Sequence, residues 1–184
     1  MTNKLPVHAI SANYYTDVNF FEREKQHLFS RSWQYACHQS QIPNKGDYLC
    51  FDIAGDSLVT VRGKDDEIRT FYNVCQHRAH QLVEGSGNKK VFVCPYHAWT
   101  YELDGALRSG PNINVVPGFD KSKICLTQVK TEVFLGFVFV NLANDAPSMD
   151  TMYPQVREQL AEFRERAPFR SRALLQPHPA SSRS

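Results

Sequence analysis

Residues 73–80 read Asn-Val-Cys-Gln-His-Arg-Ala-His, and residues 93–99 read Val-Cys-Pro-Tyr-His-Ala-Trp. Each segment carries one cysteine and one histidine: Cys75 with His77, one residue between them, and Cys94 with His97, two residues between them. Sixteen residues separate His77 from Cys94. Each pair is expected in a loop beside a short strand, so two hairpin-like loops can converge on one site. Such a site offers two thiolates and two imidazoles.

Two kinds of metal centre use this set of side chains. Zinc sites with two cysteines and two histidines usually take both cysteines from one segment and both histidines from another. Here each segment gives one of each. A cluster of two irons and two sulfides fits this set, because two thiolates hold one iron and two imidazoles hold the other. The pattern favours the diiron cluster, with a zinc site and coincidence as the alternatives.

The order Cys-x-His, a spacer, and Cys-x-x-His resembles the Rieske motif. Residues 71–82 and 94–107 are similar to the Rieske domain of the large (alpha) subunit of ring-hydroxylating-type Rieske non-haem iron oxygenases, and the resemblance covers residues 35–145. It implies a Rieske-type 2Fe-2S cluster. The iron ligands that it implies are Cys75, His77, Cys94 and His97.

Two alanines separate this chain from much of that family. Glycine often follows His-Arg and the second ligand histidine there, whereas this sequence has Ala79 and Ala98. The form with alanine resembles the branch that acts on choline, carnitine and glycine betaine. The substrate itself, quaternary ammonium or aromatic, is not identified by these residues.

The resemblance also implies a set of residues around the cluster. Respiratory Rieske proteins brace their loops with a disulfide and donate a serine hydroxyl to the cluster; His80 and Tyr96 align with the disulfide and Trp99 with the serine. Loss of such hydrogen bonds lowers the potential, which we expect at roughly −150 mV, the low end of the Rieske range. Tyr101 is a candidate hydroxyl donor, and Arg78 a candidate for orienting the loop or docking a partner.

The pattern of residues predicts a mainly β fold: a Rieske-type small antiparallel β domain with flanking N-terminal and C-terminal helices. A helix capped by Thr16 or Asp17 is expected to run to about Arg31 with an apolar stripe packed on a core. About eight strands are expected between residues 34 and 142, with Gly85-Ser86-Gly87 as a turn. The predicted divisions are a helical lead-in (1–34), the Rieske domain (35–145), a linker helix (146–163) and a basic, disordered tail (164–184).

Composition narrows the class of protein. The 184 residues have a net charge of +2 and no Lys/Arg stripe, which argues against nucleic-acid binding. The longest apolar run, Val133 to Val140, is too short to cross a membrane, and no secretory signal is visible, so a cytoplasmic location is expected. Cys37, Cys50 and Cys125 lack metal spacing and are expected to be buried thiols.

The resemblance implies a second metal that these residues do not hold. In that family oxygen is activated at a mononuclear non-haem iron bound by two histidines and one carboxylate. Only His178 follows His97, so we expect the catalytic domain to be absent and the chain to be cut or frame-shifted. The implied partners are an NAD(P)H-dependent flavin/iron–sulfur reductase and, in the full-length form, a homotrimer. The alternatives are a stand-alone Rieske ferredoxin and a structural zinc domain.

Overall fold

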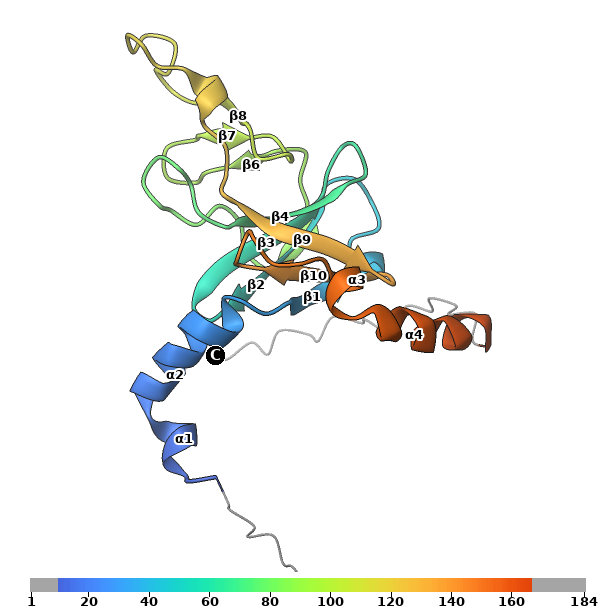
Figure 1. Cartoon of the computed structure of the whole chain (residues 1–184). Helices are drawn as coiled ribbons and strands as arrows, with labels where there is room; N and C mark the ends of the chain where they lie inside the picture. Colours follow the sequence, from blue (N-terminus) through green and yellow to red (C-terminus); the bar gives the residue numbers. More distant parts are fainter. Residues whose placement is uncertain (1–9, 167–184) are drawn as a thin grey trace, which may run out of the picture. The chain divides into compact units, whose positions relative to one another are not determined.

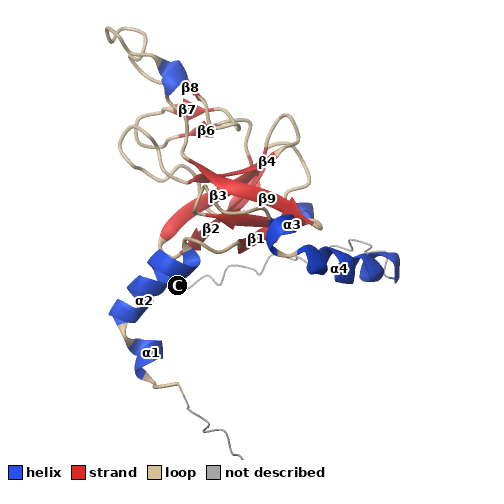
Figure 2. Cartoon of the chain, viewed as in Figure 1, coloured by secondary structure: helices blue, strands red, loops and turns tan. Residues whose placement is uncertain are grey.

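A computed structural model of the chain describes residues 10–166 and divides it into two compact units, Met1–Pro147 and Ser148–Ser184. The first unit contains two antiparallel sheets (Figures 1 and 2). The larger has seven strands in the order β1-β10-β9-β4-β3-β2-β5. Its strands are β1 (Gln34–His38), β2 (Asp47–Ile53), β3 (Asp56–Arg62), β4 (Ile68–Tyr72), β5 (Ser86–Asn88), β9 (Gln128–Phe134) and β10 (Phe137–Asn141).

The smaller sheet has three short strands in the order β6-β7-β8. They are β6 (Phe92–Val93), β7 (Thr100–Tyr101) and β8 (Leu107–Ser109). One buried hydrophobic cluster joins the two sheets, because Val59 and Phe71 of the larger sheet belong to the same cluster as Phe92 and Tyr101 of the smaller one. Short 3-10 helices occur at η2 (Gln39–Gln41) and η3 (Lys121–Lys123). The mainly β, antiparallel prediction is confirmed.

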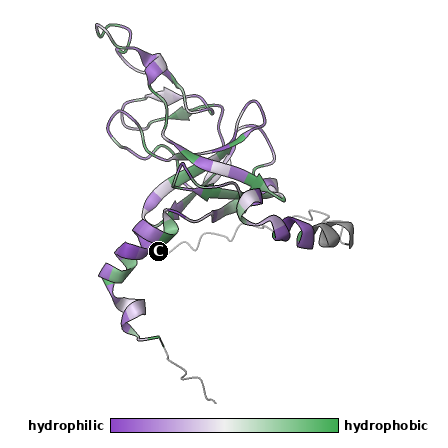
Figure 3. Cartoon of the chain, in the orientation of Figure 1, coloured by the Kyte–Doolittle hydropathy of each residue, from purple (hydrophilic) through white to green (hydrophobic). Residues whose placement is uncertain are grey.

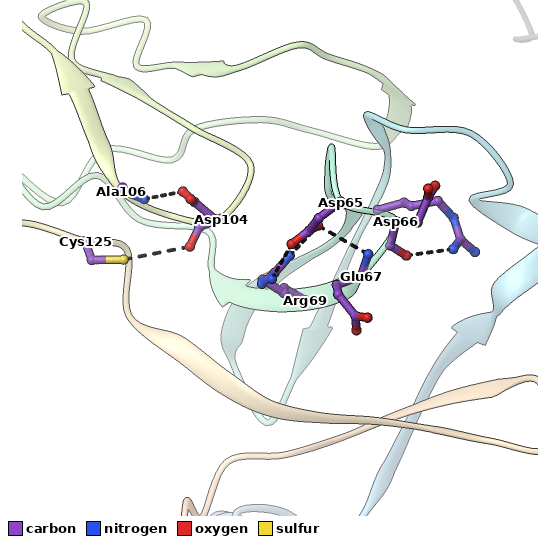
Figure 4. Close-up of polar contacts among 8 residues, drawn as sticks. Asp65, Asp66, Glu67, Arg69, Asp104, Ala106 and Cys125 are labelled. Carbon is purple, nitrogen blue, oxygen red and sulfur yellow. Dashed lines mark hydrogen bonds and ion pairs between the residues drawn. The ribbon is translucent and has the colours of Figure 1, made fainter.

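Backbone conformation and short side-chain hydrogen bonds shape the turns between the strands. Ala54 and Gly55 both have positive φ between β2 and β3, as a two-residue hairpin turn requires. In the turn before β4, the Asp65 carboxylate receives both Arg69 guanidinium bonds, 2.9 and 2.7 Å long (Figure 4). In the turn before β8, the Ala106 N–H donates to Asp104 Oδ1 at 3.0 Å (Figure 4).

The described residues contain ten strands where about eight were expected. The turn predicted at Gly85-Ser86-Gly87 is wrong, since Ser86–Asn88 forms β5 on the open edge of β2. Glycine is useful in that strand because the Tyr48 ring lies against it: a Cβ added to Gly87 would be 3.3 Å from Tyr48 Cε1. The ring needs a position without a side chain, and the residue type that signals a turn here makes room for packing.

The N-terminal helix differs in part from the prediction. Asp17 caps only its second part, α2, by accepting the Asn19 N–H at 2.8 Å. The segment begins with α1 (Asn13–Thr16), continues as α2 (Val18–Glu24) and ends in a π-helical turn, η1 (Lys25–Phe29). Only the end of the apolar stripe reaches a core, through Phe29, while Leu28 is 51% exposed. Figure 3 shows α2 carrying both hydrophilic and hydrophobic residues.

The second unit contains two helices, α3 (Met149–Met152) and α4 (Pro154–Arg166). Ser148 caps α3 by accepting the Thr151 N–H at 3.2 Å. Proline at the first position of α4 fits a helix start, because that position has no intrahelical acceptor for an N–H. Residues 167–184 of the predicted basic tail lie outside the described residues. Between residues 10 and 166, no helix has both the length and the apolar character needed to span a membrane.

Candidate metal centre

Two short loops of nearly identical backbone carry the predicted ligands. Loop one is defined as residues 75–80 and follows β4; loop two is residues 94–99 and joins β6 to β7. The Cys75 N–H donates to the His80 carbonyl, and the Cys94 N–H donates to the Trp99 carbonyl, both at 2.8 Å. The cysteine carbonyls accept N–H groups four residues on, both at 2.9 Å. Each loop is therefore closed on its own cysteine before any metal is considered.

A left-handed residue sits at the same place in both loops. Ala79 has φ 52° and Ala98 has φ 55°, and each is the fourth residue after its cysteine. A side chain costs about 1–2 kcal/mol in this region, whereas glycine adopts it freely. The structure thus explains why glycine is common at these positions in the resembling family. The backbone path is kept here despite the strain.

The two thiols lie inside the core. Cys75 and Cys94 are each 2% exposed. The fully buried Tyr101 hydroxyl lies 3.3 Å from Cys75 Sγ and accepts the Gln76 N–H at 3.0 Å. Its own proton is then available to donate to a Cys75 thiolate, which can only accept. Burial, and after it the bond to Cys75, raise the pKa of Tyr101, so the hydroxyl keeps that proton.

The two imidazoles face each other across the loops. The His77 and His97 ring centroids are 4.8 Å apart, at an interplanar angle of 77°. The Nδ1 atom of His97 is buried without a hydrogen-bond partner among residues 10–166. A buried unpaired nitrogen is costly unless it binds something, so Nδ1 has the character of a ligand atom. Desolvation, and then the positive potentials of His77, Arg78 and His80, lower the pKa of His97, which favours the neutral ring that metals bind.

The other residues predicted around the site also gather there. Trp99 stacks on His77 with centroids 4.8 Å apart and planes 13° apart. His80 and Tyr96, one from each loop, have ring centroids 5.7 Å apart. Arg78 is exposed beside His77.

This donor set fits a two-iron cluster with two protein ligands on each iron. Buried sulfurs form one pair and facing imidazoles the other, which is the division that such a cluster needs. Among the described residues, no three His, Cys, Asp or Glu side chains are grouped around a single point.

A family model described as "Rieske [2Fe-2S] domain" matches residues 32–120. The chain contains a Rieske [2Fe-2S] domain. The expected cofactor type and the resemblance to Rieske oxygenase subunits are confirmed.

The chain is also similar to individual oxygenase subunits. The carnitine monooxygenase oxygenase subunit of Escherichia coli (strain K12) is 44% identical over 154 residues, covering 83% of this chain and 41% of that protein. The crystal structure of the quaternary ammonium Rieske monooxygenase CntA in complex with L-carnitine matches with a TM-score of 0.77 and 40% identity, over 82% of this chain and 43% of that one.

A ring-hydroxylating enzyme is also similar. A naphthalene 1,2-dioxygenase mutant bound to phenanthrene matches with a TM-score of 0.73 and 34% identity, over 78% of this chain and 33% of that one. The match to the carnitine monooxygenase subunit described above covers about two fifths of that protein's length. The chain is thus similar to the Rieske-containing subunits of both carnitine monooxygenases and ring-hydroxylating dioxygenases.

Sequence reasoning gave no role to Asn73, which holds the exit of loop one in the Rieske domain. Asn73 is fully buried at the end of β4. Its Nδ2 donates to the Val83 carbonyl at 2.7 Å, and its Oδ1 accepts the N–H groups of Leu82 and Val83 at 3.3 and 3.2 Å. A polar residue directly after a buried strand was the available signal, but its partners lie nine and ten residues away.

A hollow beside the histidines was also not anticipated. It has a volume of about 540 Å³ and is lined by loop two together with residues 111–119. Its lining includes His77, Tyr96, His97, Trp99, Val116 and Phe119. The site therefore opens on a partly apolar surface.

The remaining cysteines separate into two kinds. Cys37 is buried and Cys50 half-buried, and desolvation raises the pKa of each thiol to about 11. Cys125 is exposed, so the expectation that it is a buried thiol is wrong. Cys125 forms an isolated β-bridge with Ala106. Its Sγ lies 4.0 Å from the Asp104 carbonyl oxygen (Figure 4).

Proposed function

We propose that this Rieske domain binds a [2Fe-2S] cluster through Cys75, His77, Cys94 and His97 and works as an electron-transfer domain of a non-haem iron oxygenase. The observation that carries the proposal is the pairing in the two loops. Two buried sulfurs and two facing imidazoles are held by backbone hydrogen bonds of matched length. The thiolates would hold one iron and the imidazoles the other.

The side chains around the proposed cluster have different roles. When bound, a Rieske cluster accepts and releases one electron at a time. Burial of Cys75 and Cys94 keeps water from the sulfurs, and Tyr101 holds a proton toward Cys75 Sγ. Nδ1 of His97 is the nitrogen that would ligate, because it is the buried one. Arg78 stays a candidate for docking a partner, since it is exposed beside His77.

The partners in this proposal lie outside the 184 residues. This chain spans 41% of the Escherichia coli carnitine monooxygenase subunit, and in this proposal a mononuclear iron is held by a segment or chain other than these 184 residues. A reductase that draws electrons from NAD(P)H in the cytoplasm would supply the Rieske domain, within an oxygenase that assembles as a trimer. Similarity to carnitine monooxygenase subunits supports a quaternary ammonium substrate. The division into segments 1–34, 35–145, 146–163 and 164–184 stays a prediction.

Anaerobic purification with assays for iron and acid-labile sulfide tests the cluster. About two irons and two sulfides per chain are expected, with an electron paramagnetic resonance signal that appears on dithionite reduction. One zinc and no sulfide would establish the structural zinc domain instead. Mixing the reduced domain with an oxygenase catalytic domain and its quaternary ammonium substrate tests the partner. A domain that accepts electrons from a reductase but never passes them to such a catalytic domain would favour the stand-alone ferredoxin.

A further inference from the structure

Aromatic rings form a continuous row through both loops and beyond them. Successive centroid separations along the row are 5.7, 3.8, 4.8, 4.8 and 5.9 Å. The two proposed ligand rings occupy its centre. In order, the rings are His80, Tyr96, His97, His77, Trp99 and Phe119.

Two of these contacts join equivalent places in the two loops. Tyr96 stands two residues after Cys94 and meets His80, which stands five residues after its own cysteine. His77 stands two residues after its cysteine and meets Trp99, five residues after Cys94. In each loop, the second residue after the cysteine therefore contacts the fifth residue after the cysteine of the other loop. Ring contacts therefore connect the two loops where a disulfide does not, since all five cysteines are free.

The two cross-connections differ in how they are supported. Trp99 is 8% exposed and packs edge-on against Phe119, with centroids 5.9 Å apart. A Cβ on Gly110 would lie 2.8 Å from Trp99 Cδ1, so the backbone also closes on the indole. This connection is part of the core.

The connection between His80 and Tyr96 lies at the surface. Tyr96 is 54% exposed. His80 Nδ1 contacts the Gln81 carbonyl oxygen at 2.7 Å, which fixes the plane of its ring. Tyr96 then lies between this oriented ring and His97, 3.8 Å from the latter between centroids. Removing either surface ring leaves the core intact.

We propose that His80 and Tyr96 are positioning residues that latch the two loops together and hold the His97 ring in its ligating orientation. The proposal rests on the proposed ligand role of His97. The Trp99 stack supports His77 from within the core, and the His80–Tyr96 latch supports His97 from the surface. An aromatic pair contributes beyond its buried area, so the latch slows the opening of the loops.

Cluster loss to an iron chelator, followed by visible absorbance in the purified holoprotein, tests the latch. Tyr96→Ala and His80→Ala are each expected to speed cluster loss about fivefold, and Tyr96→Phe, which keeps the ring, to restore the wild-type rate. The double variant should lose the cluster no faster than Tyr96→Ala, since that single variant already removes the contact between Tyr96 and His80. Tyr35→Ala is the matched control: Tyr35 is also 54% exposed and pairs with Phe137 at 6.0 Å, away from the loops.

Hydrogen exchange in the metal-free protein provides a readout that needs no cluster. The Ala79 and Ala98 amides, hydrogen-bonded within the loops, are expected to exchange about fivefold faster in Tyr96→Ala, with the amides of β3 and β4 unchanged. Equal rates in Tyr96→Ala and wild type, in a protein that does bind iron and sulfide, would overturn the latch and leave the proposed function standing. Absence of iron and sulfide from the wild type would instead overturn the proposed function.

Discussion

Loop one and loop two follow the same backbone path but are held in place by different neighbours. Each closes on its cysteine with bonds of 2.8 and 2.9 Å and turns at a left-handed alanine. Loop one receives the Tyr101 hydroxyl at its sulfur and is anchored at its exit by Asn73. Loop two is anchored by Trp99 and borders the hollow. Main-chain geometry thus places the two cysteines at equivalent positions, whereas the histidines follow them by two and three residues and the neighbours of the two loops differ.

The largest effect should come from the ligands, where the loops are equivalent. Cys75→Ser and Cys94→Ser should each abolish the cluster, because each loop supplies half of the thiolate pair. Iron and sulfide content, with the reduced-state paramagnetic signal, is the measurement. Cys125→Ser is the matched control, since Cys125 is exposed and distant in sequence from both loops, and it should retain a full cluster. A Cys75→Ser protein with normal sulfide content contradicts the ligand set.

Loss of the Asn73 side chain should loosen loop one more than loop two. Asn73→Ala leaves the Leu82 and Val83 N–H groups without their acceptor and removes the shortest hydrogen bond to the Val83 carbonyl. We expect the free energy of unfolding to fall by about 2–3 kcal/mol, and loop one to exchange its amides faster than loop two. Urea unfolding and hydrogen exchange measure the two effects. Asn44→Ala, at an exposed turn, is the control, and equal loosening of both loops would show that they are not anchored independently.

The Tyr101 hydroxyl should distinguish the two sulfurs. Its bond to Cys75 Sγ is stronger when the sulfur carries more negative charge, so the bond favours the reduced state. Tyr101→Phe removes it and is expected to lower the reduction potential by about 50 mV, since about 1 kcal/mol corresponds to that shift for one electron. A redox titration of the holoprotein gives the value. Tyr48→Phe, a core tyrosine bonded to the Glu84 carbonyl instead, should leave the potential within error of wild type.

The smallest effect on stability is expected at the two alanines with positive φ, one in each loop. Ala79→Gly and Ala98→Gly relieve a positive φ, and each is expected to raise the free energy of unfolding by about 0.5–1 kcal/mol after the entropic cost of glycine. Chemical denaturation of the two single variants and the double variant tests this. Equal gains at both positions would show that the common backbone, rather than the neighbours, stores the strain. Ala106→Gly, at a position without positive φ, should instead destabilise.

Local sequence patterns predicted the ligand segments and most of the larger sheet. Alternating β-branched and aromatic residues mark β2, β3 and β4, because each of these strands pairs with neighbours on a pleated surface. The strand at Ser86–Asn88 was missed, since its glycine serves the Tyr48 ring, and that ring approaches from another strand. Cross-loop contacts such as His80–Tyr96 were not predictable either. They depend on how two loops converge, which spacing along one segment does not encode.

The location of the two buried sulfurs has a further consequence. Cys75 follows β4 of the larger sheet, and Cys94 follows β6 of the smaller one, nineteen positions along the chain. A shared iron would therefore act as a cross-link between the sheets, comparable with a disulfide that closes a loop of similar length and contributes about 3 kcal/mol. Under the proposed function, iron supply and the stability of the polypeptide would be coupled, because a chain without iron would lack this cross-link between its two sheets.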